Sequence, residues 1–286
     1  MRKLILLLTF LGLAACQGNT DYGGNISGKT IVGGEEADAT NPLSRLILSH
    51  RTILTDNGGE DAEGTEVRYL QCSASALTKT LILTAAHCVK PDTSSTIDFK
   101  DADGRWVSTP VVKATIIDEY QTNNDADLAI LTLSQPLPDF IQMVTLPEPT
   151  LPIDLKKTKL MAAGWGRNVD VAPYGGAGTL RFVGVSITNY AIEESTFIVD
   201  QTDGKGMCQG DSGGPGLIEF QGKNYVLGVA KKTMFVQTED DSETHKCNYK
   251  GTYVNVLKYK KWIVDTVNAL SQEPAQSSLS EDGASL

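Results

Sequence analysis

The sequence predicts an all-β protein built from many short antiparallel strands. Short runs rich in Val, Ile, Leu and Thr recur along its 286 residues, and 27 glycines and 11 prolines supply frequent turns between them. One convincing helix lies near the end, where Tyr259, Trp262, Ile263, Val267 and Leu270 recur at helical spacing. Short strands closed by one helix fit a pair of antiparallel barrels or a sandwich, and periodicity alone leaves both open.

Seven segments are predicted as strands because they are short, apolar or alternating, and bounded by turn residues. They are 81–83, 111–117, 128–133, 160–163, 182–187, 225–230 and 252–256. Turns are predicted at 101–104 and 203–206, where Asp and Gly cluster. Asp98, Asp101 and Asp103 also resemble part of a calcium loop, but the distal Glu is missing, so a hairpin turn is the preferred interpretation.

The charge balance argues against nucleic-acid binding. Lys and Arg number 25 against 35 Asp and Glu, which gives a net charge of -10 and a surface that repels polyphosphate. We expect no nucleic-acid partner. Acidic runs at 56–66 and 239–243 are predicted to be solvated loops.

The first residues predict export. Arg2 and Lys3 precede an apolar run at 4–13, which is too short to span a bilayer because spanning takes about 20 residues. Residues 13–16, Leu-Ala-Ala-Cys, resemble the bacterial lipobox and would make Cys16 the lipidated first residue. This interpretation accounts for the odd count of 5 cysteines. An ordinary signal peptide followed by a chance cysteine is the alternative.

Composition divides the chain into four parts. Residues 1–15 are predicted to be a signal peptide, 16–30 a polar lipid tether or pro-segment, 31–270 the folded body and 271–286 a disordered tail.

Three segments carry the chemistry. His87 follows an apolar strand and small residues, at a strand end. Ser212 lies in Gly-Asp-Ser-Gly-Gly-Pro at 210–215, where glycines let backbone N–H groups approach a substrate closely. Asp127 begins an alternating strand and could orient an imidazole. A serine hydroxyl is a weak nucleophile that needs an adjacent base and an oxyanion site, so the three together indicate nucleophilic catalysis.

These segments resemble the trypsin/chymotrypsin family of serine proteases. The resemblance rests on Ile-Val-Gly-Gly at 31–34, Thr-Ala-Ala-His-Cys at 84–88, Asp-Leu-Ala-Ile-Leu at 127–131 and the serine motif at 210–215, in the family's order. Gly-Trp-Gly at 164–166 and Gly-Thr-Tyr at 251–253 also fall in place. The resemblance implies two six-stranded antiparallel barrels with a C-terminal helix, and an active site in the cleft between the barrels.

The resemblance also implies the catalytic roles. Ser212 is the nucleophile, His87 the general base and then acid, and Asp127 the residue that orients the imidazole. The N–H groups of Gly210 and Ser212 form the oxyanion hole. Asp125 is a rival for the orienting carboxylate, but only from Asp127 do the following apolar residues fit the family's positions.

Disulfides are implied in the same way. Cys72 pairs with Cys88 beside the catalytic histidine and Cys208 with Cys247 beside the specificity pocket, which leaves Cys16 for the lipid. Neither a metal nor another cofactor is expected.

Activation of a zymogen is implied by a buried ion pair between the freed amino group of Ile31 and the carboxylate of Asp211. Thr30 precedes Ile31 where the family usually has Arg or Lys, so the activating protease must accept Thr30 or trim after Lys29. The lipid on Cys16 lies before the cleavage site, so activation should release the protease. We therefore expect an exported lipoprotein of the bacterial cell envelope, monomeric and acting on polypeptides.

The specificity pocket is implied to consist of Gly206, Met207, Thr233 and Gly251. Glycine stands where trypsin-like enzymes place an aspartate, so the prediction is a deep apolar slot that takes large apolar residues first, acidic ones second and basic ones last. Acidic residues are included because Lys231 or Lys232 could turn inward.

One departure from the family favours a competing function. Lys231, Lys232 and Thr233 replace the usual Ser-Trp-Gly, which backs the catalytic aspartate and lines the cleft. The leading hypothesis is a serine endopeptidase, and the alternative is a catalytically silent binding protein of the protease fold. By position, the acidic run at 56–66 could also favour basic substrate residues on the leaving-group side of the cleft.

Overall fold

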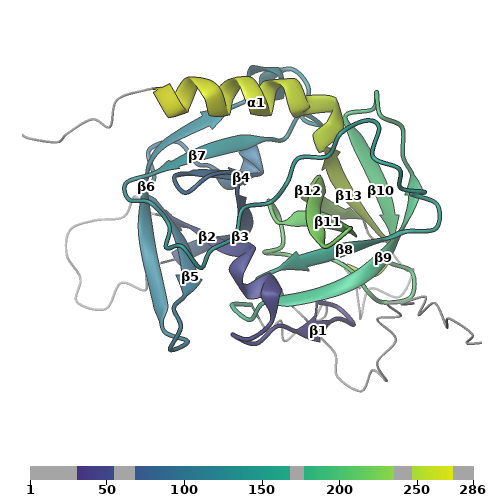
Figure 1. The fold of residues 1–286 in the computed structure, drawn as a ribbon, viewed down its shortest axis with the longest axis horizontal. Coiled ribbons are helices and arrows are strands. Elements are labelled where there is room, and N and C mark those ends of the chain that lie inside the picture. The colour runs from purple at the N-terminus through teal and green to yellow at the C-terminus, as the bar shows by residue number, and fades with distance from the viewer. Residues whose placement is uncertain (1–30, 55–67, 168–176, 235–246, 273–286) are drawn as a thin grey trace, which may run out of the picture.

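The computed structural model describes residues 31–54, 68–167, 177–234 and 247–272. Its first half forms a closed antiparallel barrel (Figure 1). The strands of this barrel, in spatial order, are β2 (Ile47–Leu54), β3 (Arg68–Ala76), β4 (Leu81–Thr84), β7 (Ala129–Leu133), β6 (Trp106–Ile116) and β5 (Ser95–Lys100).

The second half forms another antiparallel barrel. Its strands are β8 (Lys159–Gly164), β9 (Arg181–Asn189), β10 (Thr196–Asp200), β13 (Lys250–Asn255), β12 (Lys223–Met234) and β11 (Pro215–Phe220), and pairing of β8 with both β9 and β11 closes the ring. The short β1 (Glu35–Glu36) adds to the edge of β9. The predicted pair of six-stranded antiparallel barrels is confirmed.

Helix α1 (Val256–Gln272) follows β13 directly and packs on both barrels, against β12 and β7 (Figure 1). Tyr259 and Ile263, four residues apart, are buried on its inner face. The predicted strand 252–256 was one residue too long, because Val256 already begins the helix. The side chain of Asn255 accepts a hydrogen bond from the Leu257 N–H at 3.1 Å, which caps the first turn.

Several strands escaped prediction because they bury polar side chains. Strand β2 holds His50, which is fully buried, and Arg51, which forms an ion pair with the buried Asp98 of β5. A charged pair of this kind interrupts the apolar pattern that marks a strand in sequence. Strands β1, β3, β5, β10 and β11 were missed as well.

The hairpin between β5 and β6 confirms the predicted turn at 101–104. Its carboxylates are used locally: Asp101 accepts hydrogen bonds from the backbone and side chain of Arg105, and Asp103 pairs with the same guanidinium. Both turn carboxylates that suggested a calcium loop therefore have partners within the turn.

The barrels share a core where they meet. Ile47 and Leu83 of the first barrel and Leu217 and Val229 of the second lie in one cluster of buried side chains. The indole of Trp165 donates to the carbonyl of Ile47 at 3.2 Å across this junction. Three 3-10 turns interrupt the strands, namely η1 (Pro42–Arg45), η2 (Ala86–Cys88) and η3 (Asp118–Gln121).

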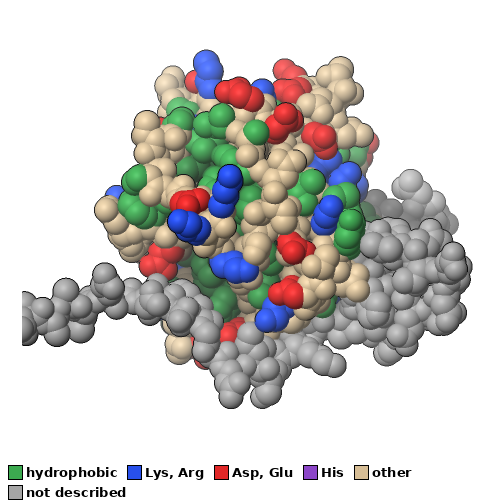
Figure 2. All heavy atoms as spheres, turned by 90° about the vertical axis from the view of Figure 1, so that its right-hand side faces the viewer, with side chains coloured by type: hydrophobic (Ala, Val, Ile, Leu, Met, Phe, Trp, Pro, Cys, Tyr) green, Lys and Arg blue, Asp and Glu red, His purple; other side chains and the backbone are tan. Residues whose placement is uncertain are grey.

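Several predicted segments lie outside the described residues: the signal peptide, the tether, both acidic runs and the tail from 273 onward. Helix α1 continues to Gln272, two residues beyond the predicted end of the body. In the described ranges no helix is both long and apolar enough to cross a membrane. Figure 2 shows acidic and basic side chains interspersed on one face of the molecule, with no broad basic area in its described part.

Candidate active site

His87 lies in η2, immediately after β4, and is held by Asp127 at two points. The Asp127 carboxylate accepts the backbone N–H of His87 at 2.8 Å and contacts the ring Nδ1 at 2.6 Å. Asp127 is 1% exposed, whereas a third of the His87 side chain faces solvent. Because a carboxylate only accepts hydrogen bonds, this contact places the proton on Nδ1 and leaves Nε2 as a base.

The rival carboxylate has another partner. Asp125 forms an ion pair with Lys231, with Oδ1 and Nζ 2.9 Å apart. The structure thus brings Asp127, and not Asp125, against His87. Sequence reasoning missed this pair, in which the Lys231 side chain is only 9% exposed.

Ser212 lies in the loop that precedes β11, at the junction of the barrels. Its carbonyl accepts the Ser73 N–H from the first barrel at 2.7 Å, and its hydroxyl donates to the carbonyl of Lys231 at 3.5 Å. No hydrogen bond from the hydroxyl to His87 occurs among the described residues. A hydroxyl held by one long bond can turn toward a base when a substrate binds, as catalytic contacts often tighten only then.

The loop around Ser212 leaves two amides free. The N–H groups of Asp211, Gly213 and Gly214 each donate to a backbone carbonyl. Those of Gly210 and Ser212 donate to none of the described residues. Two unpaired N–H groups beside a serine hydroxyl are the donors that an oxyanion hole requires.

Ser73, which the sequence analysis did not single out, holds this loop in place. Its hydroxyl donates to the carbonyl of Gly210 at 3.0 Å and accepts the Trp165 N–H at 2.9 Å. Its own carbonyl accepts from Thr84 Oγ1 at 3.0 Å. Only its position after Cys72 could have drawn attention to it.

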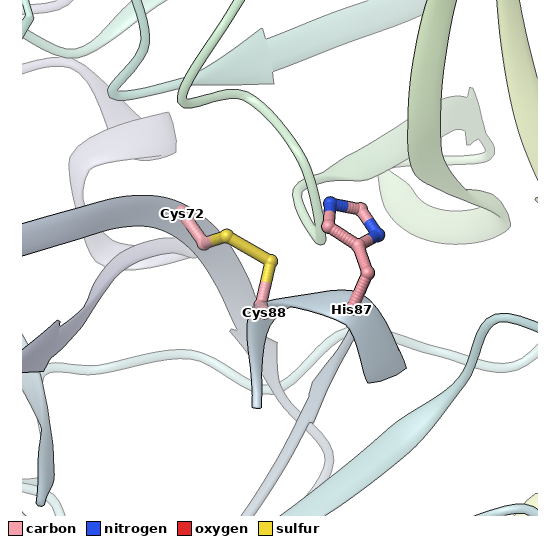
Figure 3. Close-up of side chains that lie close together, drawn as sticks. All are labelled: Cys72, His87 and Cys88. Atoms are coloured by element: carbon pink, nitrogen blue, oxygen red, sulfur yellow. A yellow bond between two sulfur atoms is a disulfide. The ribbon is translucent and has the colours of Figure 1, made fainter. Parts of the chain in front are cut away.

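Both implied disulfides are present, Cys72–Cys88 and Cys208–Cys247. Figure 3 shows the first beside the ring of His87. Atoms of Cys72, His87 and Cys88 that could ligate a metal lie within 4.8 Å of one another. The two sulfurs are bonded to each other, so they are not the thiolates that a metal site needs.

Asp211 is buried behind Ser212. Its Oδ1 accepts the Gly166 N–H at 2.8 Å and its Oδ2 the Cys208 N–H at 2.7 Å. Burial raises the pKa of this carboxyl to about 7, although these two donors and Arg181 act to lower it.

The glycines of the 164–166 motif make room for this carboxylate. A Cβ on Gly164 would lie 2.2 Å from Asp211 Oδ1, and a Cβ on Gly166 would lie 2.6 Å from its Cγ. Any larger residue at either position would displace Asp211.

Ile31 packs inside the second barrel, in the same cluster as Met207 and Val199. The Val32 carbonyl accepts the Gly206 N–H at 3.0 Å, so this segment pairs with the chain just before Met207. Ile31 follows Thr30 through a peptide bond and has no charged amino group; no ion pair with Asp211 occurs among the described residues. The φ of Ile31 is +38°, a strained value for a β-branched residue.

A pocket of about 210 Å³ opens beside Ser212. It is lined by Met207, Cys208, Gln209, Ser212, Lys231, Lys232 and Thr233. Met207 and Thr233 therefore line it as expected. Gly206 and Gly251, which were predicted to line it as well, are not among its lining residues, and the buried side chain of Gln201 packs against both of them. Lys231 does not offer a free charge to an acidic substrate, since Asp125 already pairs with it.

Two six-stranded barrels with a histidine–aspartate pair and a serine loop at their junction define a chymotrypsin-like fold. Residues 54–263 match the Trypsin family, so the chain belongs to the trypsin family of serine proteases. It is 28% identical to transmembrane protease serine 11G of Rattus norvegicus over 69% of this chain and 49% of that protein. It is 27% identical to vitamin K-dependent protein C of Rattus norvegicus over 68% of this chain and 45% of that protein.

A relative of similar length is human chymotrypsin-like elastase family member 1, which is 27% identical over 83% of this chain and 92% of that protein. The chain spans only about half the length of the two rat relatives. Their similarity therefore concerns the protease domain.

Proposed function

We propose that this chain is an exported serine endopeptidase that hydrolyses peptide bonds through an acyl-enzyme. The observation that carries the proposal is the contact between Asp127 and His87 beside the loop in which Gly210 and Ser212 keep their N–H groups free. Family membership supports polypeptides as the substrate class.

The proposal gives each step of the reaction to a named side chain or backbone group. His87 Nε2 takes the proton of the Ser212 hydroxyl as the oxygen attacks the substrate carbonyl. The oxyanion that forms is stabilised by the N–H groups of Gly210 and Ser212, each typically worth about 2.7–4 kcal/mol in the transition state. His87 then gives the proton to the leaving amine, and water repeats the sequence on the acyl-enzyme. Asp127 holds the imidazole in the tautomer that this requires and stabilises its charged form.

The chain is proposed to be made as a zymogen that is cut before Ile31. The strained φ of Ile31 supports this, because cutting the preceding peptide bond abolishes that constraint. Asp211 supports it too, since a buried carboxylate that forms no ion pair among the described residues is unfavourable, and a freed α-amino group would supply a partner. The family's pairing of Ile31 with Asp211 remains part of the proposal.

Lipidation of Cys16 and placement in a bacterial cell envelope are proposed from the sequence of the first 16 residues alone. Since Cys16 precedes Ile31 and both described disulfides lie within the body, cleavage would release the protease from the membrane.

A fluorophosphonate probe tests the function directly, because it labels a serine only when that serine is activated as a nucleophile. We expect labelling of the processed protein at Ser212, and its loss in Ser212→Ala and His87→Ala. A well-folded wild-type protein cut at Ile31 that takes no label and cleaves no peptide would favour the silent binding protein instead.

A further inference from the structure

Behind Met207, one of the residues that line the pocket, lies Gln201, which no sequence motif singles out. This residue follows β10 and is 0% exposed. A Cβ on Gly206 would lie 2.2 Å from Gln201 Cδ, and a Cβ on Gly251 would lie 2.3 Å from Gln201 Oε1. The carboxamide thus occupies the space that two missing side chains leave under the pocket.

The hydrogen bonds of Gln201 fix which way its amide points. Nε2 donates to the carbonyl of Met207 at 3.0 Å and to that of Cys247 at 2.6 Å. In the flipped orientation an oxygen would face two carbonyl oxygens, which cannot donate, so the nitrogen must lie on that side. The oxygen consequently lies on the other side, next to Gly251.

Gln201 Oε1 is a buried acceptor with no hydrogen-bond partner among the described residues. Such an atom is unfavourable, because it has lost water and gained nothing in return. The methyl end of Met207 lies beside it, since the same Cβ on Gly251 would be 3.1 Å from Met207 Cε. Met207 also lines the pocket, and an unbranched methionine can move aside at little cost.

We propose that Gln201 is a specificity-determining residue, whose Oε1 accepts a hydrogen bond from a neutral donor at the end of the residue before the scissile bond. This inference rests on the proposed peptidase function. The side chains that fit are long, apolar along their length and tipped with an uncharged O–H or N–H, as in Tyr or Gln. Their purely apolar counterparts, Phe and Met, fill the same space but leave the acceptor unpaired.

The charges around the pocket exclude the other polar classes. No carboxylate lies among its lining residues in the part of the chain that the structure describes, so an Arg or Lys would lose its hydration with only a neutral oxygen as partner there. An acidic residue would bring an acceptor toward an acceptor, and the ammonium of Lys231, a residue that lines the pocket, already forms an ion pair with Asp125. Lys232 is exposed.

The test compares kcat/KM on peptides that differ only at the residue before the scissile bond. The full chain is expressed with its leader and purified in the form that a fluorophosphonate labels. We expect Tyr to be preferred over Phe, and Gln over Met, by about tenfold or more, as one hydrogen bond to a buried neutral group produces. Ratios near one, or a maximum at Ala or Val, would overturn the proposal and show a slot that Gln201 merely shortens.

Gln201→Met keeps the length of the side chain and removes its oxygen. We expect it to abolish the Tyr-over-Phe preference while Phe itself is cleaved within a few-fold of the wild-type rate. Gln142→Met makes the same substitution on an exposed residue and should leave the ratio unchanged. The wild-type ratios decide the proposal even if Gln201→Met fails to fold. Absence of both labelling and cleavage would count against the peptidase function, whereas labelling with the wrong preference counts only against Gln201.

Discussion

Asp211 should make the uncleaved chain less stable as the pH rises. Most carboxylates have the opposite effect, because their pKa values are lowered in the fold. Burial raises the pKa of Asp211 in the fold to about 7, against 3.8 for a free side chain. The folded state therefore binds this proton more tightly than the unfolded state does. Its contribution to stability is fully present below pH 4 and is lost as the pH rises to 7.

The size of this effect follows from the difference in pKa. About three pKa units correspond to about 4 kcal/mol of unfolding free energy between pH 4 and pH 7. Asp211→Asn has nearly the same shape and does not titrate, so it should remove this dependence. Its amide can accept only one of the two N–H groups that Asp211 binds, so the whole curve should also lie lower.

A second buried group acts in the opposite direction. Burial lowers the pKa of His50 to about 4, so the folded state excludes a proton that the unfolded state takes up below about 6.5. Acidification from pH 6.5 to 4 should thus cost on the order of 3 kcal/mol at this residue. In the parent protein both effects add to those of the other titrating groups, and Asp211→Asn removes only the contribution of Asp211.

The assay is denaturant unfolding of the full chain from pH 4 to 8, with Ser212→Ala in every sample to prevent self-cleavage. The informative quantity is the difference between the parent curve and the Asp211→Asn curve, because the His50 contribution cancels. We expect the parent's advantage over Asp211→Asn to shrink by about 4 kcal/mol from pH 4 to 7. Parallel curves would refute the reasoning, since they would show that Asp211 titrates alike in both states.

Three further outcomes are expected. Ser212→Ala or His87→Ala should lower kcat by a factor on the order of 10⁴–10⁶ with folding retained; near-normal peptidase activity in either would disprove the assignment. Gly213→Ala should lower the free energy of unfolding by about 2–4 kcal/mol, because φ is +80° there and the new Cβ would lie 2.2 Å from the Thr84 hydroxyl oxygen. Gly104→Ala has a similar φ of +76° but no atom within 4 Å of the new Cβ, so it should lower this free energy by only about 1–2 kcal/mol. Equal losses in Tm would contradict this. Amino-terminal sequencing should find Ile31 in the active, soluble fraction, and an Ile31 terminus that stays on carbonate-washed membranes would exclude release.

The candidate catalytic residues could be predicted from the sequence because short motifs carry them. His87, Asp127 and Ser212 each stand in a local pattern, and the structure brings Asp127 against His87. The pattern could not reveal Ser73, whose contacts with Trp165, Gly210 and Ser212 reach segments far away in the chain. A serine after a cysteine carries no signal of its own until the barrels assemble.

Lys231 shows how pairing changes what a charge can do. In sequence it stands beside the pocket, where a free ammonium would attract an acidic substrate. In the fold its ammonium reaches Asp125, just ahead of the catalytic strand, and is nearly withdrawn from solvent. The motif around Asp127 indicated that Asp125 does not orient the imidazole. It could not predict that Asp125 would form an ion pair with Lys231.

The floor of the pocket shows where counting along the chain fails and packing succeeds. Counting back from Ser212 reaches Gly206, and the opposite wall is Gly251, so two absent side chains leave a hole in the sequence-based picture. Protein interiors are packed about as densely as organic crystals, so such a hole is filled by some other side chain. Pairing of β10 with β13 sets Val199 opposite Gly251 and brings the next turn of chain, with Gln201, beneath the pocket. Two facing glycines are thus a signal that another side chain packs between them, and in this protein that side chain carries an acceptor for which the described residues provide no hydrogen-bond donor.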